Sequence, residues 1–177
     1  FSNFGGRAAS EPGDLDYTTV EQSAMTADDV YVLVVDANDN FLYQVQDLKL
    51  GNPVEGDNYY TRQLEGTMLR TVGGERVKLV VLANLKDNKI ASYTTGAAIR
   101  NFLETKKGSN IAKVYKELVY HYGGSTIPWK LAERAIPMWG SSNLTAVPGT
   151  GVDLACNLYR AVAKVGRMDI KDSLSQR

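Results

Sequence analysis

The chain has one cysteine and one histidine, the residue types that most readily suggest covalent catalysis. A thiol activated by an imidazole can act as a nucleophile, and Cys156 and His121 would supply the two groups. Cys156, however, lies in the run from Asp153 to Leu158, which is typical of a strand. A lone cysteine in a strand is usually a small core hydrophobe. We therefore expect a buried thiol and a structural or surface histidine, and no Cys156–His121 dyad.

Other catalytic and metal-binding patterns are absent from the sequence. It contains no GxSxG, HExxH, phosphate-loop or dinucleotide motif. Asp36-x-Asn38-x-Asn40 has the spacing of a calcium loop, but Phe41 stands where glycine is needed and Asp47 where a bidentate Glu is needed. We predict a hairpin tip at this loop, no enzyme activity, no cofactor and no metal.

Composition points to an ordinary globular domain. The 177 residues are 44% hydrophobic and 23% charged, enough for one domain with a sizeable core. Lys plus Arg and Asp plus Glu number 20 each, so no global basic field exists to hold nucleic acid. No run of 18 apolar residues occurs.

The densest apolar run, Val77 to Leu85, predicts a central strand. Its valines and leucines suit a pleated sheet, and both of its faces are apolar. Asp28 to Asp36 predicts a second strand of the same kind. The turn residues 37–40 then lead into Phe41 to Leu48, whose alternation predicts a hairpin partner.

The spacing of the apolar residues changes from a strand pattern to a helix pattern after the central strand. It returns to a strand pattern before the end of the chain. Thr94 or Thr95 can cap a helix through Lys106, and Ser109 can cap a second amphipathic helix that Gly123 stops. We expect Pro137 to bar its segment from a central ladder. The further strand predictions are Tyr59 to Leu64, Thr67 to Val72, Leu144 to Val147, Val152 to Leu158 and Tyr159 to Ile170.

Strands, two helices and strands again predict an all-β class: a two-sheet β-sandwich carrying a two-helix insertion. Residues 1–24 are polar and Gly-rich and predict a flexible arm, in which Arg7 and Ala8 would be open to an arginine-specific protease. Residues 25–177 would form the sandwich, with the helical insertion at about 94–122. A polar end with no completing element suggests the N-terminal domain of a longer subunit.

Four segments carry a family resemblance. Ile136-Pro137-Met138-Trp139-Gly140 precedes Leu158 to Val165, and Val30 to Asp36 and Lys78 to Asn84 come before them in order. Together they resemble the N-terminal domain of Bacteroidetes fimbrillins, the subunits of type V pili, over residues 28–170.

The resemblance implies a transthyretin-like Greek-key β-sandwich, usually two per subunit, and an outer-membrane lipoprotein precursor that ends in a pilus on the cell surface. An arginine-specific protease trims such precursors, and a strand from the next subunit fills the groove that opens. Arg7-Ala8 matches the processing pattern in position, and Phe1 to Arg7 would be a remnant of a removed strand or only a tail. We expect the groove to be lined by Asp28 to Asp36 and Tyr159 to Ile170.

The predicted function is therefore a structural pilus subunit domain that assembles by strand exchange and supports adhesion. Its partners would be other pilin subunits, the protease, and host glycans or proteins. The alternative is a carbohydrate-binding or tip-adhesin module of the same fold, with Trp129 and Trp139 as stacking residues. Asp172-Ser173-Leu174 resembles the O-glycosylation signal of this phylum, which makes Ser173 a candidate modification site.

Overall fold

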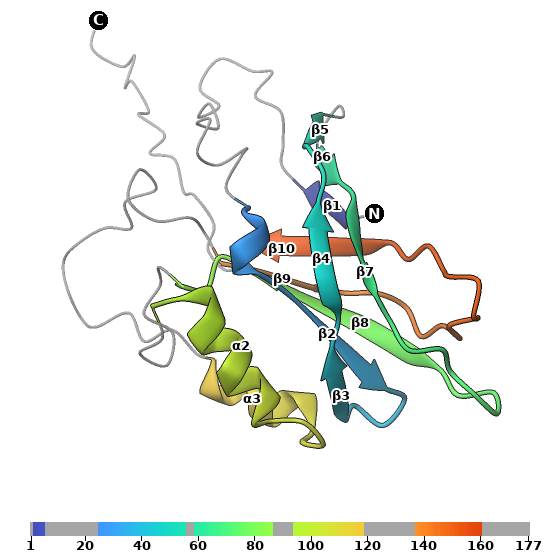
Figure 1. The fold of residues 1–177 in the computed structure, drawn as a ribbon. Helices are drawn as coiled ribbons and strands as arrows, with labels where there is room; N and C mark the ends of the chain where they lie inside the picture. The colour runs from blue at the N-terminus through green and yellow to red at the C-terminus, as the bar shows by residue number, and fades with distance from the viewer. Residues whose placement is uncertain (1, 6–24, 56–58, 87–93, 119–136, 161–177) are drawn as a thin grey trace, which may run out of the picture.

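The structure is a computed structural model that describes residues 2–5, 25–55, 59–86, 94–118 and 137–160 (Figure 1). Strands dominate it, and two short helices lie together on one side. In chain order the elements are β1 (Ser2–Gly5), the 3-10 turn η1 (Ala27–Asp29), β2 (Val30–Asp36), β3 (Phe41–Gln44), β4 (Gln46–Leu50), β5 (Val54–Glu55), β6 (Tyr59–Arg62), β7 (Leu64–Thr67), β8 (Val77–Ala83), α2 (Gly96–Glu104), α3 (Ile111–Glu117), β9 (Met138–Ser141) and β10 (Cys156–Arg160).

The central strand predicted from the sequence is β8. It pairs antiparallel with β2 along its whole length, from Val77 opposite Asp36 to Ala83 opposite Val30, and its other edge pairs with β9. Its side chains are buried on both faces, as the apolar pattern predicted. The β2–β3 hairpin is also confirmed, with Asp39 of its turn at a φ of 64°.

The sheet has eight strands in the order β3-β2-β8-β9-β10-β1-β6-β5, and β4 and β7 form a separate two-stranded ribbon. β3 runs into β4 through Val45, and β6 runs into β7 through Gln63, so the ribbon joins the two ends of the sheet. Figure 1 shows the ribbon crossing over the central strands. Residues of the ribbon, among them Leu48, Leu50 and Leu64, pack against the buried hydrophobic residues of the sheet.

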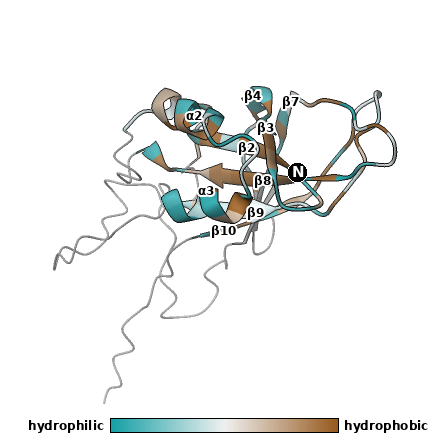
Figure 2. Ribbon diagram, turned by 90° about the horizontal axis from the view of Figure 1, so that it is seen from below, coloured by the Kyte–Doolittle hydropathy of each residue, from teal (hydrophilic) through white to brown (hydrophobic). Residues whose placement is uncertain are grey.

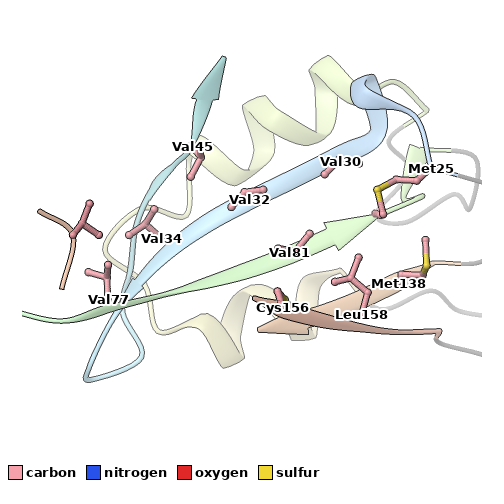
Figure 3. Packing of buried hydrophobic residues seen from close by; sticks show 12 residues of the cluster. Met25, Val30, Val32, Val34, Val45, Val77, Val81, Met138, Cys156 and Leu158 are labelled. Carbon is pink, nitrogen blue, oxygen red and sulfur yellow. The ribbon is translucent and has the colours of Figure 1, made fainter. Parts of the chain in front are cut away.

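Two hydrophobic clusters stabilise this arrangement. The interior cluster lies between the sheet and the ribbon and includes Val32, Val81, Met138 and Leu158 (Figure 3). The second cluster lies on the outer face of β2 and β8, where α2 and α3 cover it. Figure 2 shows hydrophobic residues concentrated along β8, which both clusters share.

The helix starts agree with the sequence in one case and differ in the other. Thr95 caps α2, and its side chain accepts a hydrogen bond from the Ala98 N–H, as predicted. Asn110, and not Ser109, caps α3 through the Ala112 N–H. Both residue types are good caps, but the Ser109 carbonyl is engaged by the Phe41 N–H, which places the first free cap position one residue later.

Several strand predictions were wrong in position. β9 lies between β8 and β10, in the interior of the sheet, although Pro137 precedes it. The ladder begins at Met138, so the N–H that proline lacks is not required. β7 runs across Glu65 and Gly66, where a break was predicted. The predicted strand at 144–147 is reduced to one bridge between Thr145 and Val77.

The chain is β-rich, with two helices and sheets whose pairs are antiparallel except for β1 with β10. The sequence predicted a flexible arm over residues 1–24. Ser2–Gly5 instead form a strand inside the eight-stranded sheet, and residues 6–24 lie outside the described residues. The predicted strand from Tyr159 begins earlier, at Cys156, and its continuation beyond Arg160 also lies outside them.

Candidate functional site

The candidate site is built around β1, a four-residue strand inside the sheet whose partner β10 lies more than 150 residues later in the chain. Its register with β10 is parallel, with Ser2 opposite Cys156 and Phe4 opposite Leu158. Its register with β6 is antiparallel, with Ser2 opposite Arg62. β1 therefore occupies a slot between two strands that do not pair with each other there.

A groove continues this slot beyond Ser2. If the β1–β6 register is extended beyond Ser2, it reaches β7. If the β1–β10 register is extended in the same direction, it reaches the segment before β10. The groove has a volume of about 460 Å³. Its walls include Gln63, Leu64, Glu65 and Gly66 on the β7 side and Thr150, Gly151, Val152, Asp153 and Leu154 on the β10 side. Slot and groove therefore form one extended channel along the strand direction.

The floor of the groove is apolar and its rim is polar. Two residues of the floor, Val32 and Val45, belong to the interior cluster. The others, Leu48, Met68 and Leu79, pack against that cluster. Gln63, Glu65 and Asp153 are exposed at the rim. An extended peptide fits such a channel, because alternate side chains point down and up while its backbone meets the wall strands.

Gly66 lets the ribbon close over this floor. A Cβ at that position would lie 2.5 Å from Cγ1 of Val45 and 2.9 Å from Cδ2 of Leu48. These distances are shorter than van der Waals contact, so a side chain at Gly66 would require the Val45 and Leu48 side chains in the groove to shift.

The processing site predicted from the sequence lies next to this channel along the chain. Arg7 and Ala8 follow β1 after a single intervening residue. They lie outside the described residues, as do Ser173, Trp129 and His121. The structure therefore does not test whether Trp129 lies near Trp139, and it does not test a Cys156–His121 pair.

Trp139 lies on the outer surface of β9, away from the groove. Its side chain is 42% exposed and faces Tyr115 of α3 edge-on, with ring centroids 6.0 Å apart. Tyr159, its partner in the β9–β10 ladder, is 63% exposed. Two neighbouring aromatic rings on one sheet face could stack with a flat ligand, which is the arrangement that the alternative function requires.

Cys156 is a core residue in the described structure. Its thiol belongs to the interior cluster, and burial raises its pKa to about 11. Such a thiol is protonated at neutral pH and unsuited to nucleophilic attack. Among the described residues no group of three or more His, Cys, Asp or Glu side chains is placed to hold a metal ion.

The Asp36 loop forms a turn through its own hydrogen bonds. The Asp36 carboxylate accepts them from the backbone N–H groups of Asn38 and Asn40 and from the Asn40 side chain. Burial acts to raise the pKa of Asp36, but these hydrogen bonds outweigh it and the pKa is lowered. The hairpin-tip interpretation therefore accounts for the acidic spacing.

The groove expected from the resemblance can be compared with the structure only in part, because residues 161–170 lie outside the described residues. Val32 of β2 lies in the floor, as expected, but the walls come from β7 and from residues 150–154. Tyr159 points outward and does not contribute. The signal that could have located the walls was weak: Gly66 within a strand and the Gly149-Thr150-Gly151 run before β10.

Comparisons of the chain with known protein families, with curated proteins and with solved structures give no significant match. Within the part of the chain that the structure describes, no helix has the length and apolar character needed to cross a membrane.

Proposed function

We propose that the chain is a structural pilus subunit domain that assembles by protease-triggered strand exchange. One observation carries the proposal: β1 fills a slot between β10 and β6, and Arg7 follows β1 after a single intervening residue. A cut between Arg7 and Ala8 would separate β1 from the rest of the chain. The slot would then be open to a strand from another subunit.

The physical consequence of losing β1 supports this proposal. Both β10 and β6 would lose a ladder neighbour at the same time, and their unpaired edges would lie beside the apolar floor of the groove. Unpaired strand edges beside apolar surface strongly favour pairing with another chain. Strand addition satisfies the backbone groups and covers the floor in a single step.

The finer features of the proposal come from the resemblance to fimbrillins. They are the transthyretin-like Greek-key topology, the outer-membrane lipoprotein precursor and the extracellular pilus. The partners are other pilin subunits and an arginine-specific protease, with host glycans or proteins as adhesion targets. The β-rich fold and the pairing of β1 with β10 and β6 support the strand-exchange part of the proposal.

The test is limited digestion with an arginine-specific protease, followed by intact-mass measurement and size-exclusion chromatography. We expect a cut between Arg7 and Ala8 and a shift of the cut protein to larger species. The matched control is Arg7→Lys, which removes this cleavage site and keeps the charge. A parent chain that is cut at Arg7 and keeps its elution volume would refute strand exchange as the role of β1.

A second candidate function, a carbohydrate-binding or tip-adhesin module, is favoured by the exposed Trp139 and Tyr159 pair. A glycan array with the parent and with Trp139→Ala distinguishes it, because a shaft subunit should bind no glycan. Binding that Trp139→Ala abolishes would favour the module.

A further inference from the structure

The β6 wall of the slot is tied to the fold by the side chain of Arg62, which hydrogen-bonds two carbonyl groups outside β1. The Arg62 side chain donates from Nη1 to the carbonyl oxygen of Met25, 2.6 Å away, and from Nε to the carbonyl oxygen of Gly51, 3.0 Å away. Met25 is buried in the interior cluster just before η1 and β2. Gly51 lies on the loop between β4 and β5.

The two carbonyls come from different parts of the fold, so the Arg62 side chain connects those parts. We call these two hydrogen bonds, from Arg62 to Met25 and to Gly51, the cross-tie. Gly51 lies in the segment from β4 to β7, which also contains β6. Its N–H donates to the Gln63 carbonyl of the same segment. Met25 belongs to the entry into β2, next to the central strands. A planar guanidinium can hold two carbonyls in fixed directions, which a lysine ammonium cannot do in the same way.

The cross-tie matters because the two walls of the slot are supported unequally. The β10 wall pairs with β9, which pairs with the central strand β8. The β6 wall pairs with β1 and with the two-residue strand β5. Each wall keeps a ladder of two residue pairs when β1 leaves, but the neighbour of β10 is itself paired with the central strand, whereas the neighbour of β6 is the edge strand of the sheet.

We propose that Arg62 is a positioning residue that holds the β6 wall in place while the slot is empty. This inference rests on the proposed function, because it concerns the state between loss of β1 and entry of a new strand. With the guanidinium in place the channel keeps its width. Without the guanidinium, the segment from β4 to β7 moves away from the slot or closes over the apolar floor. An incoming strand then no longer fits the channel.

The experiment uses the full chain, cut between Arg7 and Ala8 and verified by intact mass. A fluorescently labelled peptide with the sequence of residues 1–7 is added in excess, and its uptake is followed by fluorescence anisotropy. We compare the parent with Arg62→Met and Arg62→Lys. Arg70→Met is the matched control, because Arg70 is exposed on the loop after β7 and loses the same charge.

We expect Arg62→Met to take up the peptide with at least about tenfold lower affinity, because the empty channel loses the contact that holds its β6 wall in place. Arg62→Lys should lie between Arg62→Met and the parent, and Arg70→Met should equal the parent. The uncut variants, in which β1 still pairs with β6, should melt close to the uncut parent. That difference separates positioning from a general structural role, which would lower both readouts together.

Two results overturn the inference in distinguishable ways. Equal uptake by the parent and Arg62→Met refutes the cross-tie and leaves strand exchange intact. A cut parent that takes up no peptide even at the highest peptide concentration refutes the proposed function, and the role of Arg62 falls with it. If uncut Arg62→Met melts far below the uncut parent, Arg62 is part of the general framework and the positioning role is wrong.

Discussion

Replacing Gly140 by alanine tests the placement of β9 against β10, the strand that forms one wall of the slot. A Cβ added at Gly140 would lie 2.0 Å from the carbonyl oxygen of Asn157 and 2.8 Å from Cδ2 of Leu158. The first of these is a backbone atom in the next strand. The clash therefore cannot be relieved by a rotamer change, and the two strands have to move apart.

The size of the effect follows from two opposing terms. Inserting a methyl group into a closely packed site costs about 1–3 kcal/mol, and a backbone neighbour puts Gly140→Ala at the upper end. Reduced freedom of the unfolded chain returns about 0.4–1 kcal/mol when glycine becomes alanine. The net loss should be about 2 kcal/mol, or about 4–8 °C in Tm for a chain of this size.

Urea unfolding followed by circular dichroism, together with thermal melting, measures this loss. Gly149→Ala is the control, because no atom lies within 4 Å of a Cβ there. It should be neutral or slightly stabilising. If Gly140→Ala is as stable as Gly149→Ala, the close approach of β9 and β10 is wrong, and so is the slot wall that depends on it.

Two further predictions concern buried groups. Burial raises the pKa of Cys156 to about 11, so at pH 8 its thiolate fraction alone should slow iodoacetamide labelling by about a hundredfold relative to urea-unfolded protein, as mass spectrometry would show. Because the folded pKa is raised, the stability that this thiol contributes is present below the unfolded pKa and lost as the pH rises through 11; rapid labelling at pH 8 would contradict its burial. The Asp29 carboxylate accepts hydrogen bonds from the Tyr31 hydroxyl at 2.9 Å and from the Leu85 N–H at 3.0 Å. Asp29→Ala leaves these buried donors without an acceptor and should lower the free energy of unfolding, measured with urea, by about 2–3 kcal/mol. An unchanged urea midpoint would show that water replaces the carboxylate.

Local patterns in the sequence were enough to predict the centre of the fold. Valines and leucines on both faces identified β2 and β8, because only a strand covered on both sides needs them there. Thr94 or Thr95 was predicted as a helix cap because a threonine hydroxyl can accept from an N–H a few residues on, and in the structure Thr95 accepts from Ala98. Each of these signals lies within one element and needs no knowledge of a partner.

The parts that failed depend on partners far away in the chain. β1 contains glycine and polar residues, and its place in the sheet comes from pairing with β10, more than 150 residues later. β9 could be central because its ladder starts one residue after Pro137. The groove walls carry no motif, since their backbone and not their side chains makes the channel. Non-local pairing of short strands leaves little trace in a single sequence.

The length of β1 gives the proposed exchange a thermodynamic direction. β1 pairs with β6 over four residues and with β10 over three. Before cleavage its connection to Ala8 gives it a high effective concentration at the slot, and this compensates for the few contacts. After cleavage that advantage is gone, and the freed segment gains translational entropy when it leaves. A longer strand that fills both slot and groove would add ladder pairs along β7 and residues 150–154 and would cover Val32 and Val45. Cleavage would therefore convert β1 from a retained strand into a weak ligand, which an incoming strand can displace without an external energy source.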